Sequence, residues 1–418
     1  MGLFMDKKIW RRGLSLLMAV WLALGTFIQP AGALTEEQKL ISEVWRIVNR
    51  NYLDETFNHQ NWATVRQKAL EKPLKNQEAA YAAVQNMLKS LDDPFTRFLD
   101  PEQYRSLQVN TSGELTGVGL QIALDPKTGK LEVVAPIAGS PADKAGIQPR
   151  DRIIKIEGIS TENLTLDEAA AKMRGPIGSL VTLLIERDGT QEQEIRVVRD
   201  RIALNPVISD LRVTPQGTPI GYLRLNQFNA NASMELAHAI NSLEKKGAAA
   251  YILDLRNNPG GLLQAGIEIA RLWLDSGTIV YTVNRQGIQG SFEAFGPALT
   301  SDPLVILVNQ GTASASEILA GALQDNGRAT LVGETTFGKG LIQSLFELSD
   351  GSGLAVTIAK YETPQHRDIN KLGIKPDKVI PLDTITRDQI GTEADPQYQA
   401  AVELLTNNPV VVGMGNRE

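Results

Sequence analysis

The sequence predicts an α/β protein of several domains, and three observations support this fold class. The chain has 418 residues, more than the roughly 100–200 of a usual domain, so two or three domains are expected. Hydrophobic residues make up 42% of the chain and charged residues 22%, which excludes a largely disordered, collagenous or coiled-coil protein. The apolar pattern changes along the chain from helical spacing to short strands, and then to strands alternating with helices.

The N-terminus has the features of an export signal. Four basic residues between positions 7 and 12 precede the uncharged apolar stretch 14–28, and small residues at positions 31–33 supply the pattern that a signal peptidase needs. The apolar stretch has 15 residues, fewer than the ~20 that span a bilayer. We expect cleavage after Ala33 and an exported protein. An uncleaved membrane anchor is the alternative.

The segment after the signal, residues 34–107, is predicted to form a small helical region. Apolar residues recur there at three- to four-residue spacing in 34–53 and 78–91. Residues 108–203 then form a region of short strands broken by Gly and Pro. The predicted strands of this region are 131–137, 151–159 and 179–189, with one helix over 164–175.

From residue 204 to 390, strands and helices alternate, which predicts a core with a largely parallel sheet. The expected helices here are 231–245, 262–274 and 315–324. The expected strands include 221–228, 250–255, 280–284 and 303–309, followed by three more. Residues 391–418 are predicted to close the chain with a short helix, 397–406, and a tail.

Composition excludes several chemistries. The chain has no cysteine, so disulfides and thiolate nucleophiles are excluded, and its three histidines have no metal-ligand spacing. A formal net charge of −6 gives no reason to expect nucleic-acid binding. No metal or other cofactor is expected.

The region 108–203 carries a candidate site for a peptide end. A glycine-flanked turn before a strand can point backbone N–H groups at a carboxylate, and the strand after it can pair with an extended peptide. The residues of this candidate site are Gly117, Val118, Gly119, Leu120 and Gln121. An ordinary glycine turn is the alternative. The stretch 140–159, with its small-residue turn and short helix, and the helix 164–175 nevertheless resemble those of PDZ domains, which implies a reader of C-termini.

Two glycine-rich turns mark the core. Asp254 to Gly261 joins a buried strand to a helix, where free N–H groups could stabilise an oxyanion, although a plain connection is also compatible. The second turn, 333–340, has the spacing of a phosphate-binding loop. It places Gly340 where a Ser or Thr should bind magnesium, and a strand follows instead of a helix, so nucleotide hydrolysis is not expected.

A candidate nucleophile lies between a predicted strand and helix, at Ser314. Serine at such a strand end lies beside helix N–H donors, but Ser314 with Glu317 also matches a capping box that merely starts the helix. With no histidine in these motifs, the candidate base is Lys339, which must be partly buried to act as a neutral amine. Gln343, four residues on, could orient that amine. A solvated turn lysine is the alternative.

Residues 311–344, together with 254–261 and the preceding PDZ-like region, resemble the carboxyl-terminal processing (tail-specific) proteases. The resemblance implies a ClpP/crotonase-like core with an inserted PDZ domain and a Ser–Lys dyad. It assigns the nucleophile to Ser314, the base to Lys339 and the orienting amide to Gln343. It also places the oxyanion-hole amides at Ala315 and in the Gly260-Gly261 turn, with Gly260 favoured. Two further residues are implied in supporting roles, Asp325 and the PDZ arginine Arg174.

Residues 43–62 and 360–377 resemble the branch that processes the photosystem II reaction-centre protein in cyanobacteria and chloroplasts. That resemblance implies removal of a C-terminal extension from a membrane-associated precursor by a soluble enzyme in the thylakoid lumen. A general periplasmic tail-specific protease is the alternative. Two further alternatives are an inactive PDZ scaffold or chaperone, and a crotonase-like acyl-CoA enzyme. The sequence does not fix the oligomeric state, and a monomer is favoured.

Overall fold

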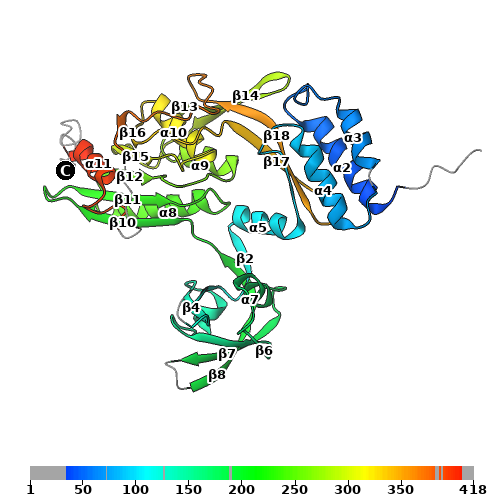
Figure 1. The fold of residues 1–418 in the computed structure, drawn as a ribbon. Coiled ribbons are helices and arrows are strands. Elements are labelled where there is room, and N and C mark those ends of the chain that lie inside the picture. Colours follow the sequence, from blue (N-terminus) through cyan, green and yellow to red (C-terminus); the bar gives the residue numbers. More distant parts are fainter. Residues whose placement is uncertain are drawn as a thin grey trace, which may run out of the picture. The chain divides into compact units, whose positions relative to one another are not determined.

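The structure, a computed structural model, describes residues 34–406 except 72, 126–127, 188–190, 382–385 and 387–388. The predicted export signal therefore lies outside the described residues. The chain divides into two compact units, one of residues up to 100 with 345–356 and the other of the remaining residues (Figure 1). Within the described ranges, no helix has the length and apolar character needed to cross a bilayer.

The smaller unit begins with three helices, each opened by a polar side chain. Thr35 and Gln38 form a reciprocal capping box, while Asn61 and Asn76 cap the next two helices. The helices are α2 (Glu36–Asn51), α3 (Trp62–Leu70) and α4 (Gln77–Lys89). A short strand, β1 (Arg97–Leu99), pairs antiparallel with the start of β18 (Gly353–Glu362). These three helices lie within residues 34–107, where a helical region is expected from the sequence, and the strand β1 accompanies them.

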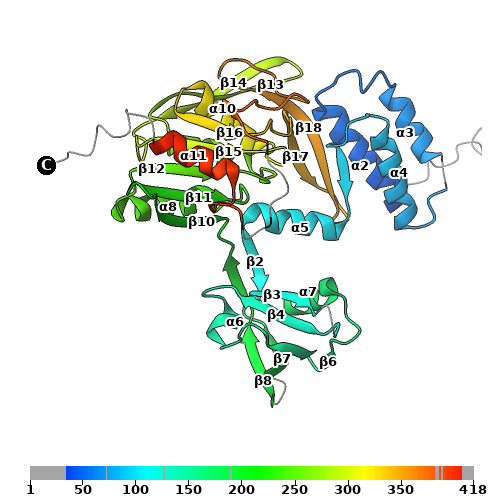
Figure 2. The same ribbon diagram turned by 60° about the vertical axis from the view of Figure 1, so that its left-hand side comes forward.

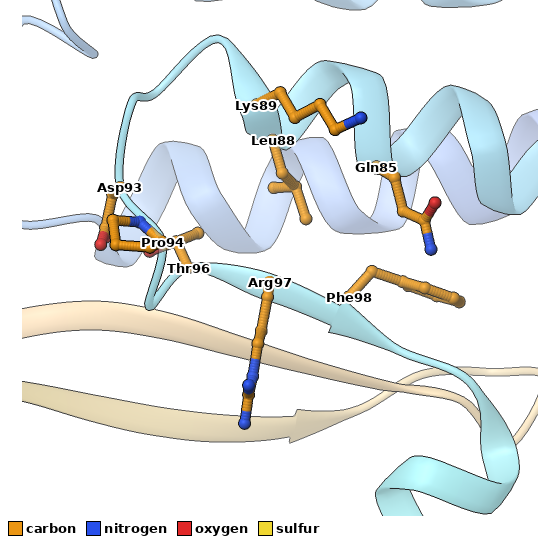
Figure 3. Close-up of a pocket in the computed structure, with 8 residues that line it drawn as sticks. All are labelled: Gln85, Leu88, Lys89, Asp93, Pro94, Thr96, Arg97 and Phe98. Carbon is orange, nitrogen blue, oxygen red and sulfur yellow. The ribbon is translucent and has the colours of Figure 1, made fainter.

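A cavity of about 280 Å³ lies in the smaller unit, between the end of α4 and the segment leading into β1 (Figure 3). It is lined by Gln85, Leu88, Lys89, Asp93, Pro94, Thr96, Arg97 and Phe98. The Thr96 hydroxyl donates to Asp93 Oδ2 at 2.7 Å, and the Phe95 N–H donates to Asp93 Oδ1 at 2.9 Å. These bonds give Asp93 a structural role, in which it shapes the turn between the helix and the strand.

The larger unit opens with α5 (Pro101–Ser112) and continues into the PDZ-like region. The strands β2 (Glu114–Gly117) and β9 (Asp200–Ala203) pair antiparallel and enclose this region in the sequence. Its sheet has the order β3-β4-β5-β7-β8, with β6 paired to β5, so β3 is an edge strand. The elements are β3 (Leu120–Leu124), β4 (Leu131–Pro136), α6 (Pro141–Lys144), β5 (Arg152–Ile156), β6 (Ile159–Ser160), α7 (Leu166–Met173), β7 (Leu180–Arg187) and β8 (Gln191–Val198).

The core of the larger unit is a six-stranded sheet of order β10-β11-β12-β15-β16-β19, in which only β10 runs antiparallel to its neighbour. The strands are β10 (Val207–Val213), β11 (Pro219–Leu225), β12 (Ala250–Asp254), β15 (Leu304–Val308), β16 (Ala329–Gly333) and β19 (Lys378–Val379). The helices are α8 (Ala232–Lys245), α9 (Leu263–Arg271), α10 (Ala315–Asp325) and α11 (Pro396–Thr406). The predicted α/β fold class with a largely parallel core sheet is confirmed.

Alternation along the buried strands divides the core into two layers. Tyr251 and Leu253 of β12 pack with α8, α9 and α10, while Ala250 and Ile252 pack with α11 on the other face. Figure 2 shows α11 in front of β12, β15 and β16. The C-terminal helix is therefore an integral layer of this unit.

The chain also forms a second sheet, which is antiparallel. The strands β13 (Ser276–Asn284) and β14 (Gly287–Phe295) form a hairpin, and β13 also pairs with the end of β18. The strand β17 (Leu341–Glu347) pairs with β18. This sheet matters for the site because β17 follows the lysine-bearing turn, and β18 carries Tyr361 toward Ser314.

Candidate active site

Two loops that the sequence predicted as functional follow adjacent parallel strands. The turn 255–262 follows β12 and the loop 309–314 follows β15, and Asp254 pairs with Leu307 in the register of these strands. Since both strands end at the same edge of the sheet, both loops lie at that edge. In open α/β sheets, this edge is where ligands bind.

Hydrogen bonds join these two loops into one body. Asn257 and Asn309 bond reciprocally, with the Asn257 N–H donating to Asn309 Oδ1 at 2.9 Å and Asn309 Nδ2 donating to Asn257 Oδ1 at 3.0 Å. Thr312 Oγ1 donates to the Leu255 carbonyl oxygen at 2.9 Å, and the Ala313 N–H donates to that of Asn258 at 3.0 Å. With so many crossing bonds, the position of one loop fixes the position of the other.

Ser314 has a backbone conformation that serine rarely adopts. Its φ of 57° and ψ of −118° lie outside the main allowed regions, and such strain costs on the order of 1–3 kcal/mol. Its N–H donates to Glu317 Oε2 at 2.9 Å, and its carbonyl oxygen accepts the Tyr361 hydroxyl at 3.2 Å. Ser316 differs from it, since it is fully buried and its hydroxyl donates to the Asn258 carbonyl oxygen at 3.0 Å. Of the two serines, Ser314 is half-buried, whereas the Ser316 hydroxyl is used within the core.

Gly260 packs directly against the backbone of Ser314. A Cβ at this position would lie 2.6 Å from the Ala313 carbonyl oxygen, 2.9 Å from the Ala315 nitrogen and 2.9 Å from Ser314 Cβ, and φ is +93°. Glycine therefore leaves open the space beside the N–H of Ala315. Ala315 is the first residue of α10, so its N–H has no acceptor within that helix. The N–H of Gly260 itself donates to Asn258 Oδ1 at 2.9 Å.

Glu317 connects the serine loop to the lysine turn. Its fully buried carboxylate accepts the N–H groups of Ser314 and Lys339 on Oε2, both at 2.9 Å. On Oε1 it accepts the Thr336 hydroxyl and, at 2.7 Å, the Gly338 N–H. The backbones of Ser314 and Lys339 are therefore held side by side by a single carboxylate oxygen.

Further contacts fix the lysine turn. The Phe337 N–H donates to the Thr312 carbonyl oxygen at 3.0 Å, and the Lys371 N–H donates to that of Gly338 at 2.8 Å. Lys339 is half-buried. Gln343, on β17, donates through Nε2 to Thr357 Oγ1 at 3.4 Å.

Asp325 lies at the opposite end of α10 from Ser314. It pairs with the Arg367 guanidinium and accepts the Gln365 N–H at 3.0 Å, and its side chain is almost fully buried. Eleven residues separate it from Ser314 in the sequence, which is ~16 Å of helix at 1.5 Å per residue. The structure thus places Asp325 in support of the turn after β18 and away from the serine.

In the PDZ-like region, the predicted peptide-binding residues lie from the end of β2 to the start of β3, beside the end of α7. Gly117 ends β2 against the backbone of Met173 and Arg174 at the end of α7, and a Cβ on it would approach the Met173 carbonyl oxygen to 3.3 Å. Val118 is buried, Gly119 has a φ of +80°, and Leu120 and Gln121 begin the edge strand β3. The glycine turn, the exposed Arg174 and the free edge of β3 are therefore close together.

Sequence reasoning missed Arg199, which binds the end of α7 beside the predicted peptide-binding residues. The nearly buried guanidinium donates to the carbonyl oxygens of Met173 at 3.1 Å, Lys172 at 2.8 Å and Leu180 at 2.8 Å, and to Ser179 Oγ at 3.1 Å. It thereby caps the C-terminal end of α7. No local pattern marks it, because its partners lie 19 to 27 residues away.

Comparisons with known proteins agree with this geometry. The family model for peptidase family S41 matches residues 219–380, and that for the PDZ domain matches residues 132–187. A carboxyl-terminal-processing protease of Synechocystis sp. is 60% identical over 97% of this chain and 95% of its own. The chloroplastic carboxyl-terminal-processing peptidase 2 of Arabidopsis thaliana is 48% identical over 84% of this chain and 70% of its own.

Among solved structures, a photosystem II D1 C-terminal processing protease matches with a TM-score of 0.56 and 39% identity. The match covers 87% of this chain and 100% of that one. The predicted fold class, an α/β protease core with a PDZ domain, is confirmed, and so is the prediction of a serine protease. The chain belongs to the carboxyl-terminal-processing proteases of peptidase family S41.

Proposed function

We propose that this chain is an exported serine endopeptidase in which Ser314 and Lys339 form the catalytic dyad. The observation that carries the proposal is the shared carboxylate oxygen of Glu317, which binds the backbone N–H groups of both residues. A nucleophile in a strained, half-exposed position beside a half-buried lysine suits acyl transfer without histidine.

In the proposed reaction, neutral Lys339 accepts the Ser314 hydroxyl proton as Oγ attacks the scissile carbonyl. The Gln343 amide nitrogen is directed at Thr357, which leaves its carbonyl oxygen available to orient the lysine amine. The N–H of Ala315 and a donor of the Gly260-Gly261 turn, with Gly260 favoured, stabilise the oxyanion. Because the Gly260 N–H donates to Asn258 here, its use as a donor requires exchange of that bond. Protonated Lys339 then gives its proton to the leaving amine, and water hydrolyses the acyl-enzyme.

The proposed substrate is a protein with a C-terminal extension, held by the PDZ domain. Backbone N–H groups around Gly117 to Gly119 would bind the terminal carboxylate, with Arg174 nearby, and the preceding residues would pair with the edge strand β3. The solved relative named for photosystem II D1 processing supports the photosystem II reaction-centre precursor as the substrate. The chloroplastic relatives are consistent with the thylakoid lumen, and the periplasm remains the alternative location.

The test is incubation of the chain without residues 1–33 with a peptide that copies the C-terminus of the reaction-centre precursor, read by mass spectrometry. Wild type and Ser316→Ala should make one defined cut, while Ser314→Ala and Lys339→Ala should make none. Full activity of Lys339→Ala would refute the dyad. Absence of this cut, with degradation of unrelated proteins that have apolar C-termini, would retain the dyad and replace the substrate.

A further inference from the structure

A buried ionic cluster lies at the start of the Gly260 turn, on the sheet face that α11 covers. It is formed by Arg256, Asp254 and Asp395, whose side chains are 3% exposed or less. Arg256 belongs to the turn itself, and Asp395 immediately precedes Pro396, the first residue of α11. The cluster therefore connects the C-terminal helix to the segment that carries the proposed oxyanion donor.

All five N–H donors of the Arg256 guanidinium are engaged. Nε and Nη2 bind the two oxygens of Asp254 at 2.9 and 2.6 Å. Nη1 and Nη2 bind the two oxygens of Asp395 at 3.0 and 2.7 Å, and Nη1 also binds Gln397 Oε1 at 3.1 Å. Two bidentate pairs on one planar group fix its position and its orientation together.

One arginine faces two aspartates in this cluster, and both carboxylates accept further hydrogen bonds. The Tyr222 hydroxyl donates to Asp254 Oδ2 at 2.8 Å. Asp395 accepts the N–H groups of Gly391 at 2.8 Å and of Gln397 and Tyr398 at 3.1 Å each, the last two at the start of α11. Apolar side chains of similar volume often stabilise a core as well as a buried ion pair does. What this cluster provides beyond stability is therefore a fixed orientation of the Arg256 side chain.

From Arg256, fixed contacts lead to Ser314. Two residues on, Asn258 is fully buried, and its carbonyl oxygen accepts the Ala313 N–H and the Ser316 hydroxyl at 3.0 Å each. Its side chain binds the Leu225 carbonyl oxygen at 2.7 Å. A rotation of the turn at residue 256 would thus move Asn258 and Gly260 relative to the serine.

We propose that Arg256 is a positioning residue for the oxyanion turn and that it depends on Asp395, so that transition-state stabilisation requires the C-terminal helix α11 to be docked. The inference rests on the proposed roles of Ser314 and Gly260. It predicts that breaking the Arg256–Asp395 pair lowers kcat while substrate binding through the PDZ domain remains.

The test compares Asp395→Asn with wild type in the full chain, using a cleavable C-terminal peptide. The asparagine can still cap α11 but carries no charge. The control is Glu403→Gln, which removes a carboxylate from the same helix, where it pairs with Lys378 at 3.2 Å on the surface. We expect Asp395→Asn to lower kcat tenfold or more, with KM within threefold and weakened inhibition by a peptide boronate that binds serine. Glu403→Gln should match wild type in all three.

A folded Asp395→Asn with kcat within twofold of wild type would overturn the inference, as would a fall in kcat equalled by Glu403→Gln. Should Asp395→Asn fail to fold, Gln397→Met decides, because it leaves both aspartates in place and removes one acceptor from Arg256, together with a donor to the Ile380 carbonyl oxygen. It is expected to lower kcat two- to fivefold at constant KM. An unchanged kcat in that variant would also overturn the inference. Ser314→Ala, assayed in parallel, tests the proposed function separately: if it stays active, the dyad itself is wrong.

Discussion

Replacement of Glu317 by glutamine is the most informative single change near the proposed dyad. Each carboxylate oxygen accepts two donors, Ser314 and Lys339 on one side and Thr336 and Gly338 on the other. Glutamine keeps one oxygen and presents an NH₂ group to the other pair. The Thr336 hydroxyl can turn and accept from that group, but the Gly338 N–H cannot.

The magnitude follows from these bonds. One buried N–H left without an acceptor costs about 1–3 kcal/mol, and the remaining bonds lose the strengthening that a charged acceptor provides. We therefore expect Glu317→Gln to lower the free energy of unfolding by about 2–4 kcal/mol. If about half of that loss affects the position of Lys339 relative to Ser314, kcat should fall roughly 5- to 30-fold, at 1.36 kcal/mol for each factor of ten.

The assay is steady-state peptide cleavage well below the melting temperature, together with urea unfolding. Glu244→Gln is the matched control. Glu244 lies on α8, and its carboxylate accepts the Tyr251 hydroxyl at 2.8 Å, so the variant makes the same chemical change at a glutamate that also accepts a hydrogen bond. A Glu317→Gln enzyme that unfolds earlier but retains kcat within twofold would show that Glu317 stabilises the fold and does not position the proposed dyad.

Three further predictions concern the rest of the site. Gly260→Ala should abolish detectable cleavage, because its Cβ would clash with the Ala313 carbonyl oxygen, while binding of a C-terminal peptide to the PDZ domain should stay unchanged in fluorescence anisotropy. Arg199→Gln should do the reverse, weakening peptide binding several-fold with little change in kcat, because it uncaps α7. Burial alone would raise the pKa of Asp395, but the bonds and charge of Arg256 outweigh it and lower that pKa. The stabilisation that Asp395 contributes is therefore complete above its ordinary pKa and is lost as the pH falls through the lowered one. Urea unfolding should show the stability difference between wild type and Asp395→Asn shrinking as the pH falls below the ordinary pKa of an aspartate.

The sequence predicted the elements whose signals are local. The alternation of strands and helices gave the parallel core, and the glycine turns gave the two loops at the sheet edge. The strand β14 was not predicted, because its segment contains two glycines, which weaken the signal of a strand, and its pairing with β13 is what orders it. The antiparallel sheet as a whole depends on such pairings, which no local window contains.

The same distinction applies to the site. Ser314 and Lys339 could be proposed from motifs, whereas Glu317 was predicted only as half of a capping box. The structure shows that it does cap the backbone of Ser314 and also binds the turn at Thr336, Gly338 and Lys339, which lies 19 to 22 residues away. That second role depends on the parallel pairing of β15 with β16, which brings the loops after them together. The sequence signal for this second role is that a glutamate, Glu317, stands in a helix segment that is otherwise mostly apolar and expected to be buried.

The strained backbone of Ser314 explains why so many polar groups are buried around it. A conformation that costs on the order of 1–3 kcal/mol persists only if neighbouring contacts fix it from both sides. Its N–H donates to a charged acceptor, Glu317, worth about 1.5–3 kcal/mol, and its carbonyl oxygen accepts a hydroxyl bond worth about 0.5–1.5 kcal/mol from Tyr361, itself 1% exposed. Together these bonds match or exceed the strain. Apolar packing alone could not do this, because it is non-directional and would allow the backbone of the serine to relax into an ordinary helix start.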